Sequence, residues 1–323
     1  MPLRAAVLAL AFVVLAAIVY AMGPARIAAL ILASGWTFLW MILLYSAQLS
    51  LRGWILWRTL PRGHLSLVDV LRIRFAAEAV EMLTFTGPFL AEPAKGWMFV
   101  RRGVALSDAA ATIAFEYLMY TLIAADMALV GLSALLRRQA FSPGVRDPVT
   151  VLVVCLAIFT VAVLFAAVTG IGLIEPSVRL LRPVIGRQRV DAAAARVRAA
   201  ERPLLVLLSR PSKFIEAVVV EAMAHGLLVV EIWLLFRSLG LGTHVAAPFI
   251  VEGGVKFINA AFFFVPGQIG AAEGVNAVIV RALGFAPAVG VALSLMRRAR
   301  AAVVSFGGAL IAPPIRNADS QPA

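Results

Sequence analysis

Ionisable side chains lie inside apolar stretches at twelve positions of this sequence. They are Glu78, Glu81, Glu116, Asp126, Glu216, Glu221, His225, Glu231, Lys256, Arg297, Arg298 and Arg300. An ion at the centre of a membrane helix costs about 2.5–3.5 kcal/mol on insertion scales, so these groups must pair, reach an interface or line a wet cavity. Contacts that only pin helices together are an equally good interpretation of three pairs that share helical faces: Glu78 with Glu81, Glu92 with Lys95, and Glu221 with His225.

Arg297 and Arg298 are the charged residues whose depth in an apolar run most favours binding of a ligand. They lie about ten residues into the apolar run 287–312, too deep to reach its ends easily. A guanidinium presents a planar fork that matches phosphate, so we expect these two residues and Arg281 to hold one. The other expected members of the pocket are Glu81, Glu92, Lys95, Glu116, Asn259, Pro266, Gly267, Gln268, Gly270 and Glu273. Of these, Glu92 and Glu273 are expected to pair with the arginines when no ligand is bound, or to contact a cationic head group.

The composition places this chemistry in a membrane. The chain has 323 residues, of which 62% are hydrophobic and 14% charged, against about 45–50% and 25% in soluble domains. Mean hydropathy is +0.96, and apolar runs longer than about 18 residues recur along the chain, long enough to cross a bilayer. We therefore expect an all-α polytopic membrane protein with a single transmembrane domain.

The charge balance and the rare residue types narrow the function further. The net charge is +12, which in a membrane protein indicates cytoplasmic loops and anionic lipid head groups rather than nucleic acid. Only three of the 29 basic residues are lysines, a bias that a GC-rich genome explains as well as phosphate binding does. One cysteine, Cys155, and three scattered histidines predict no disulfide and no metal site. Sequence signatures of an ATPase, a metalloprotease or a serine hydrolase are absent, so we expect no catalytic residues and no cofactor.

Six full transmembrane helices are predicted, at about 5–22, 27–50, 107–135, 149–174, 214–236 and 287–312. The most basic stretches, 51–74 and 175–213, then fall on one side, which is predicted to be cytoplasmic together with both termini. The loop 136–148 disagrees, because its three arginines would lie outside. Residues 187–202 are predicted to form a helix, either against anionic lipid or as a solvated linker, and 313–323 a disordered tail.

Two further apolar segments are interrupted by glycine and proline. Residues 75–104 contain Gly87-Pro88, and residues 252–285 contain Pro266-Gly267 and Gly270. Each arm has roughly ten residues, about 15 Å of helix and half of a hydrocarbon core of about 30 Å. Irregular backbone at that depth is tolerated only where protein buries it or water lines it. Both segments are therefore predicted to be re-entrant helical hairpins.

The two interrupted segments resemble one another. The same difference in residue number pairs Pro88 with Pro266 and Glu81 with Asn259, and a further shift of three positions pairs Glu92 with Glu273. The halves, about 27–135 and 214–312, are joined by the basic linker 175–213. Their first spans end on opposite sides of the membrane, which predicts an inverted repeat. Interrupted segments in inverted repeats are typical of transport sites near the bilayer midplane.

The second hairpin carries a family resemblance. Asn259, the run Pro266-Gly267-Gln268-Ile269-Gly270-Ala271-Ala272-Glu273, then Gly284 and Arg297, resemble the motif of the lysylphosphatidylglycerol synthase transmembrane-region family, also described as flippase-like. The first hairpin resembles the earlier copy of the motif more loosely, because Glu81 stands where asparagine is usual and Thr86-Gly87-Pro88 replaces Pro-Gly. The resemblance covers about 10–312.

The resemblance implies a bacterial inner-membrane protein whose relatives move aminoacylated phospholipids between leaflets. Those relatives carry a soluble aminoacyl-transferase domain, which 323 residues do not accommodate here, so synthase activity is not expected. Other similar proteins accompany hopanoid and isoprenoid-lipid pathways, which makes a terpenoid lipid an alternative cargo and lipid-biosynthesis enzymes candidate partners.

Three hypotheses follow from the sequence. The first is a lipid flippase with a groove between the hairpins for a phosphate-bearing head group. The second is a membrane-embedded lipid-modifying enzyme, with Glu116 as a base, or an accessory subunit of a lipid pathway. The third is a carrier of a small solute. The cargo lipid, the energy coupling and the oligomeric state stay open.

Overall fold

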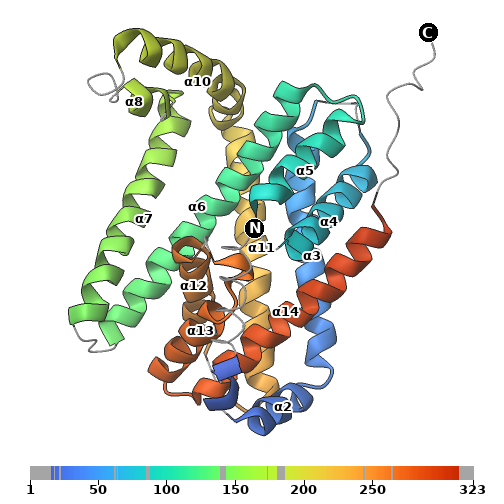
Figure 1. Cartoon of the computed structure of the whole chain (residues 1–323), viewed down its shortest axis with the longest axis vertical. Helices are drawn as coiled ribbons and strands as arrows, with labels where there is room; N and C mark the ends of the chain where they lie inside the picture. Colours follow the sequence, from blue (N-terminus) through green and yellow to red (C-terminus); the bar gives the residue numbers. More distant parts are fainter. Residues whose placement is uncertain are drawn as a thin grey trace.

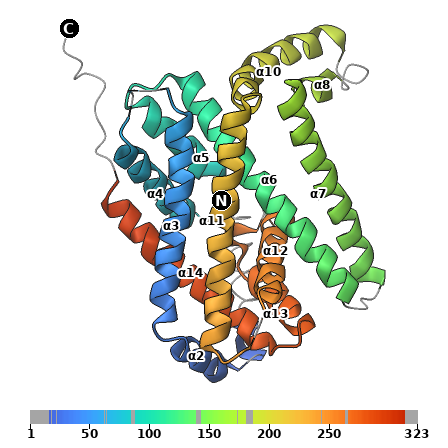
Figure 2. The ribbon, with the colours of Figure 1, turned by 180° about the vertical axis from the view of Figure 1, so that it is seen from behind.

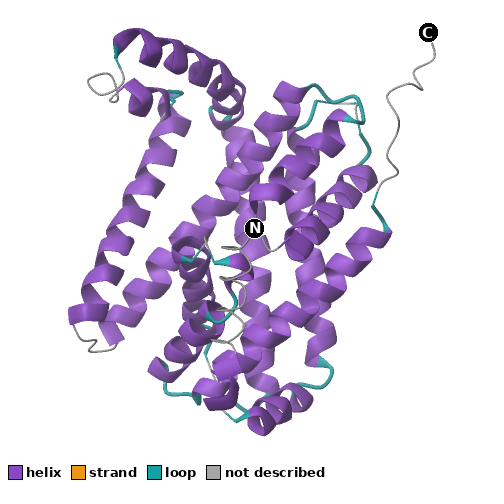
Figure 3. Ribbon diagram, viewed as in Figure 1, coloured by secondary structure: helices purple, strands orange, loops and turns teal. Residues whose placement is uncertain are grey.

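The computed structural model describes residues 16–312, apart from 18, 22, 62, 64, 85–87, 139–142, 173, 180–185, 243 and 263–264. Throughout this part of the chain the regular structure is helical, with no strand (Figure 3). The predicted span 5–22 and the predicted tail 313–323 therefore lie mostly or wholly outside the described residues, as does Gly87.

The helices follow one another with short connections (Figure 1). They are α2 (Pro24–Ala33), α3 (Thr37–Thr59), α4 (Leu67–Thr84), α5 (Pro88–Val100), α6 (Leu106–Arg138), α7 (Pro143–Thr169), α8 (Ile174–Arg179), α10 (Arg187–Leu208), α11 (Pro211–Ser238), α12 (Ala246–Ala261), the 3₁₀ turn η1 (Pro266–Gln268), α13 (Ala271–Ala282) and α14 (Pro287–Leu310). Among the described residues four helices, α3, α6, α7 and α11, are long and apolar enough to cross a membrane. The chain is a multi-pass helical membrane protein.

The predicted spans agree with the structure in the later part of the chain and disagree in the earlier part. Helices α6, α7, α11 and α14 cover the last four predicted spans to within six residues at each end. The predicted span 27–50 is wrong, because Ser34, Gly35 and Trp36 divide it into α2 and α3. Gly35 has φ +49° and the Ser34 hydroxyl donates to the Ile31 carbonyl at 2.6 Å, so the helix ends there.

Both interrupted segments form pairs of helices that pack against each other. The first pair is α4 and α5, and the second is α12 and α13. The backbone of the second break has positive φ at Gly267, Gln268 and Gly270, which stops α12 from continuing into α13. The arms have 12 to 18 residues, about 18–27 Å, so the predicted arms of about ten residues were too short. Pro93 accounts for part of this difference, because α5 continues through it.

The order of long, short, short and long helices occurs twice, in α3–α6 and in α11–α14. Helix contacts repeat in the same way, because α6 packs on α12 as α14 packs on α4, while α3 and α11 pack on each other. Figures 1 and 2 show α3 and α11 running in opposite directions through the centre of the bundle.

Glycines allow the two equivalent crossings. On α6, a Cβ at Gly131 would lie 3.3 Å from the Cα of Gly253 on α12. On α14, a Cβ at Gly308 would collide with the carbonyl oxygen of Phe75 on α4. The offset from Gly131 to Gly308 equals the offset from Phe75 to Gly253 to within one position, so both contacts occupy matching positions of the two halves.

Helix α7 lies at the edge of this arrangement. It packs on α6 and touches α10 (Figure 1). Elsewhere it presents an exposed apolar surface that includes Cys155. The basic linker 175–213 contains α8 and α10, which pack on each other at one end of α7. The predicted helix over 187–202 therefore forms the first part of α10.

Candidate functional site

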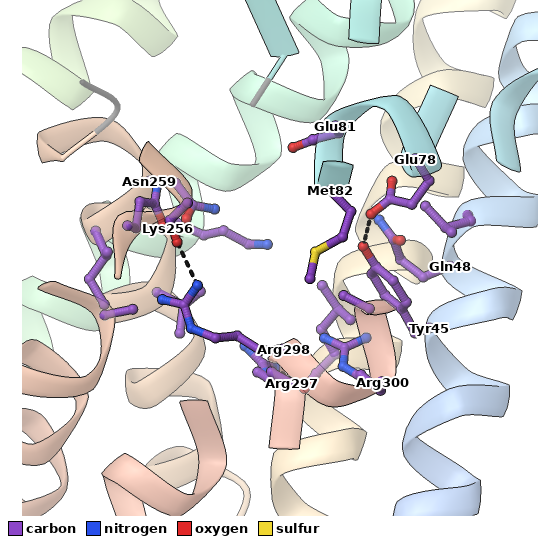
Figure 4. A pocket seen from close by; sticks show the side chains of 18 of the residues that line it. Tyr45, Gln48, Glu78, Glu81, Met82, Lys256, Asn259, Arg297, Arg298 and Arg300 are labelled. Atoms are coloured by element: carbon purple, nitrogen blue, oxygen red, sulfur yellow. Dashed lines mark hydrogen bonds between the residues drawn. The ribbon is translucent and has the colours of Figure 1, made fainter. Parts of the chain in front are cut away.

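A cavity of about 760 Å³ lies between the two halves. Its wall includes residues of α3, α4, α5 and α6 from the first half, and of α11, α12, α14 and the second break from the other. Figure 4 shows Glu78 and Glu81 of α4 across this space from Lys256 and Asn259 of α12, with Arg297, Arg298 and Arg300 of α14 along a third side and Arg300 next to Tyr45. Six basic and four acidic side chains line it, which is a large number for a cavity within apolar helices.

The second half contributes a cluster in which three cations share two carboxylates. The Arg297 guanidinium lies 2.7 Å from Glu252 and 3.0 Å from Glu231. Arg300 lies 2.6 Å from Glu231, and Lys256 lies 2.9 Å from Glu252. All five side chains are buried or nearly so, so the cluster carries one positive charge in excess at the cavity wall.

The first half contributes a cluster with the opposite balance. Glu116 is fully buried and binds Arg52 at 2.5 Å and Lys95 at 3.2 Å. Lys95 also binds Glu92 at 2.7 Å, and Arg52 lies 3.7 Å from Glu221 on α11. Two cations here face three carboxylates, so this cluster carries one negative charge in excess when all its groups are ionised.

Arg298 connects α14 to the second break. Its guanidinium binds the Glu273 carboxylate at 2.7 Å and donates to the Gly267 carbonyl at 2.7 Å. Glu273 in turn accepts a hydrogen bond from the backbone N–H of Gly270 at 2.7 Å. The break is therefore held in shape by one arginine whose side chain remains 26% exposed to the cavity.

On the opposite side of the cavity, α4 presents Glu78 and Glu81. Glu78 binds Arg74 at 3.2 Å and accepts a hydrogen bond from the Tyr45 hydroxyl (Figure 4). The Arg300 guanidinium lies over the Tyr45 ring at 3.9 Å, which joins the two halves by a cation–π contact. Glu81 lines the cavity one turn after Glu78.

Equivalent positions of the two halves carry opposite charges. The pairs, whose offsets agree to within three positions, are Arg52 and Glu231, Arg74 and Glu252, Glu78 and Lys256, Lys95 and Glu273, and Glu116 and Arg297. Three ion pairs consequently recur with their charges exchanged: Arg52–Glu116 matches Glu231–Arg297, Arg74–Glu78 matches Glu252–Lys256, and Lys95–Glu116 matches Glu273 with Arg298, the neighbour of Arg297.

Most of the residues predicted from the sequence lie at this cavity. Those that line it are Glu81, Glu92, Asn259, Gly267, Gln268, Arg297 and Arg298. Lys95, Glu116 and Glu273 are buried behind the wall. They bind Glu92, Arg52 and Arg298, respectively, which line it. Pro266 begins the 3₁₀ turn of the break, and Gly270 is buried at the end of the break.

Two predictions about partners were wrong. Arg281 is exposed near the end of α13 and does not line the cavity, because the opposite face of that helix, at Asn276, faces the cavity and donates to Ser294 at 2.7 Å. Glu92 pairs with Lys95 rather than with an arginine of the second half, so the alternative interpretation of this pair as a local contact is confirmed. The predicted pairing of Glu273 is confirmed, with Arg298 as its partner.

Sequence reasoning missed Arg52 and Glu252. Arg52 was assigned to a basic loop, whereas α3 continues through it and places it beside Glu116. Glu252 was not singled out, although its spacing of four residues from Lys256 matches that of Arg74 from Glu78. The signal that could have found both was the reversal of charge at the repeat offset.

The sequence profile of the lysylphosphatidylglycerol synthase transmembrane region matches residues 4–308. The chain belongs to this family. The predicted resemblance is thereby confirmed, and membership connects this membrane protein with lipid metabolism or lipid flipping. No curated protein and no solved structure matches the chain. Within this family member, the motif residues Asn259, Gly267 and Gln268 line the cavity, and Glu273 is one contact behind it.

Proposed function

We propose that the protein moves a polar-headed lipid between the leaflets of a bacterial inner membrane, with the head group passing through the central cavity while the acyl or isoprenoid tails stay in the bilayer. The observation that carries this proposal is the cavity itself. It brings ten charged side chains together between two interrupted helix pairs of a membrane protein from a lipid-connected family. In this proposal the basic linker 175–213 faces the cytoplasm.

The phosphate of the head group is proposed to bind on the α12–α14 side. Three cations there share two carboxylates, so an anion brings the cluster to charge balance. Arg298 is the most exposed of the cations on α12 and α14 at this wall, and Asn259 and Gln268 offer amide donors beside it. Guanidinium and phosphate form strong charge-assisted hydrogen bonds.

Binding at Arg298 also couples the ligand to the break. A phosphate that takes hydrogen bonds from this guanidinium competes with the Gly267 carbonyl and the Glu273 carboxylate. The break between α12 and α13 then loses a contact that fixes it against α14. In the proposed inverted repeat, the α4–α5 pair and the α12–α13 pair open towards opposite leaflets in turn, as interrupted helices do in transporters.

We propose transport rather than catalysis. Glu116, the carboxylate considered as a base, has one oxygen on Arg52 and the other on Lys95, and its side chain is fully buried. A general base must lie within hydrogen-bond reach of the proton it removes. This geometry favours a structural counter-ion, and membrane lipids are the proposed partners.

The test is lipid movement in proteoliposomes that contain acyl-labelled fluorescent phosphatidylglycerol, followed by quenching of the outer leaflet. Arg298→Ala removes charge-assisted hydrogen bonds worth about 1.5–3 kcal/mol, so we expect a rate roughly ten- to a hundredfold lower than that of the wild type. Arg281→Ala is the matched control, because it removes an arginine of the second half that does not line the cavity. Native mass spectrometry of both variants reports retained phospholipid.

Equal rates for Arg298→Ala, Arg281→Ala and the wild type would refute the phosphate site. Wild-type vesicles that move lipid no faster than protein-free vesicles would refute the proposed function. Size-exclusion profiles of the variants separate loss of function from loss of the fold.

A further inference from the structure

We propose that Glu81 is a proton-binding site that couples movement of the lipid to a transmembrane proton gradient. This inference rests on the proposed function. It starts from a charge imbalance at the cavity, which one carboxylate of α4 accounts for.

The cavity network contains one carboxylate more than it has cations. With His225, which lies 3.7 Å from Glu221, taken as neutral, its seven cations are Arg52, Arg74, Lys95, Lys256, Arg297, Arg298 and Arg300, and its eight carboxylates are Glu78, Glu81, Glu92, Glu116, Glu221, Glu231, Glu252 and Glu273. Within the described part of the chain, every one of these groups except Glu81 has an ion-pair partner within 4.0 Å. A proton on Glu81 brings the network to charge balance.

The charged and titratable groups around Glu81 are engaged with other partners. From α4 itself, Arg74 binds Glu78, which also accepts from Tyr45 of α3. The remaining groups facing it come from α3, α5, α6 and α14: Arg52 binds Glu116, Glu92 binds Lys95, Tyr117 lies on the cavity wall, and Arg300 binds Glu231 and stacks on Tyr45. None of these described side chains forms an ion pair or hydrogen bond with Glu81.

The position of Glu81 on its helix also disfavours a negative charge. It lies in the last turn of α4, which ends at Thr84, where the carbonyl ends of the helix present a partial negative charge. A carboxylate that is removed from bulk water without a cation is expensive, and such groups become neutral by binding a proton. Glu81 faces the cavity, so water can deliver that proton.

The second half supports the same conclusion. The position equivalent to Glu81 at the repeat offset is Asn259, which also lines the cavity (Figure 4). A protonated Glu81 resembles Asn259, because both are neutral and both donate and accept hydrogen bonds. The two halves then offer similar neutral side chains to the head group. If Glu81 is ionised, the first half repels a phosphate at this position and the second half does not.

The proposed cycle has one proton for each lipid. A Glu81 oxygen takes a proton from water on the more acidic side, an O–H bond forms, and the anionic head group enters a cavity that carries one negative charge fewer. When the cavity opens to the other side, the head group leaves, the O–H bond breaks and the proton passes to water. At equilibrium, this stoichiometry gives about a tenfold imbalance of lipid between leaflets for each pH unit.

The test uses the full-length protein in the same proteoliposomes, with a pH-sensitive dye inside and acyl-labelled fluorescent phosphatidylglycerol as the probe. We expect a pH gradient to accelerate lipid movement by the wild type and lipid addition to accelerate proton movement. Glu81→Gln should lose both responses, measured as the ratio of its rates with and without the gradient. Glu81→Asp, which retains a proton-binding group, should restore them, and Glu216→Gln, at an exposed ion pair with Arg58 outside the cavity, should match the wild type.

Five results would overturn the inference. One is a Glu81→Gln variant that still responds to the pH gradient, and another is wild-type lipid movement driven by a sodium gradient at equal pH. If the wild type moves lipid at a rate that ignores the pH gradient, the proton site fails and the proposed function survives. If the wild type moves no lipid under any condition, both fail. A Glu81→Asp variant that moves lipid without responding to the pH gradient would also overturn it.

Discussion

Replacing Glu116 by glutamine tests whether the buried charges stabilise the fold as pairs. The side chain is fully buried, with Arg52 at 2.5 Å and Lys95 at 3.2 Å. Glutamine keeps the volume and removes the charge, so both cations lose their shared counter-ion. Glu216 is the matched control, because it also binds an arginine, Arg58, at 2.6 Å, but at a partly exposed site.

The structure sets the expected magnitude. Breaking a buried ion pair by removing one partner typically costs about 3–5 kcal/mol. Arg52 keeps Glu221 at 3.7 Å, and Lys95 keeps Glu92 at 2.7 Å, so we expect the lower end, about 3 kcal/mol. Glu216→Gln should cost about 0–1 kcal/mol, as exposed pairs do.

The assay is thermal unfolding of the detergent-solubilised protein, followed by tryptophan fluorescence. If a kcal/mol shifts Tm by about 2–4 °C, Glu116→Gln should unfold roughly 6–12 °C below the wild type and Glu216→Gln within about 4 °C of it. Equal Tm values for the two variants would refute the reasoning, since the buried network would then contribute no more than a surface pair.

Two further predictions concern packing and pH. Gly308→Ala should lower Tm, because its Cβ presses on the backbone of α4 at a cost of about 1–3 kcal/mol. Gly307→Ala has no atom within 4 Å of its Cβ and should gain up to about 1 kcal/mol of helix propensity. A lower Tm for Gly307→Ala than for Gly308→Ala would contradict the close crossing of α14 and α4. The hydrogen bond from Arg198 lowers the pKa of Glu175, so the contact between α8 and α10 is present above the ordinary pKa and is lost as pH falls through the lowered one. Carboxyl NMR should show Glu175 titrating higher in Arg198→Ala, and an unchanged titration would exclude this contact in solution.

Hydropathy predicted much of the fold because membrane spans depend on long apolar runs. Helices α6, α7 and α11 follow this rule closely, and α3 meets it as a helix. The predicted span ended at residue 50 and α3 continues to Thr59, because Arg52 interrupts the apolar run in the sequence while Glu116, distant in sequence on α6, neutralises it in the fold. A charged residue that finds its partner on a distant helix interrupts the apolar run in the sequence, but it does not interrupt the helix.

The candidate site was predictable where residues sit beside a backbone break and unpredictable where partners come from distant helices. Asn259 and Gln268 flank the break and line the cavity as expected. Arg281 was placed with Arg297 by residue type alone, and the face of α13 that it occupies turns it away from the cavity. The sequence does contain a signal for these distant partners. Equivalent positions of the two halves carry opposite charges, and this pattern limits which residues can pair.

Helix α7 has no counterpart in either half, and it determines at which end of the bundle the second half begins. Residues of α6 leave the bundle at one end, α7 returns along the outside, and α11 starts from the end opposite to the start of α3 (Figures 1 and 2). The first half starts and ends near the same end of the bundle, so a second half joined to it directly would start there too and run parallel to it (Figures 1 and 2). The passage of α7 along the outside makes α11 start at the other end, so a peripheral helix far from the cavity sets the antiparallel directions of α3 and α11.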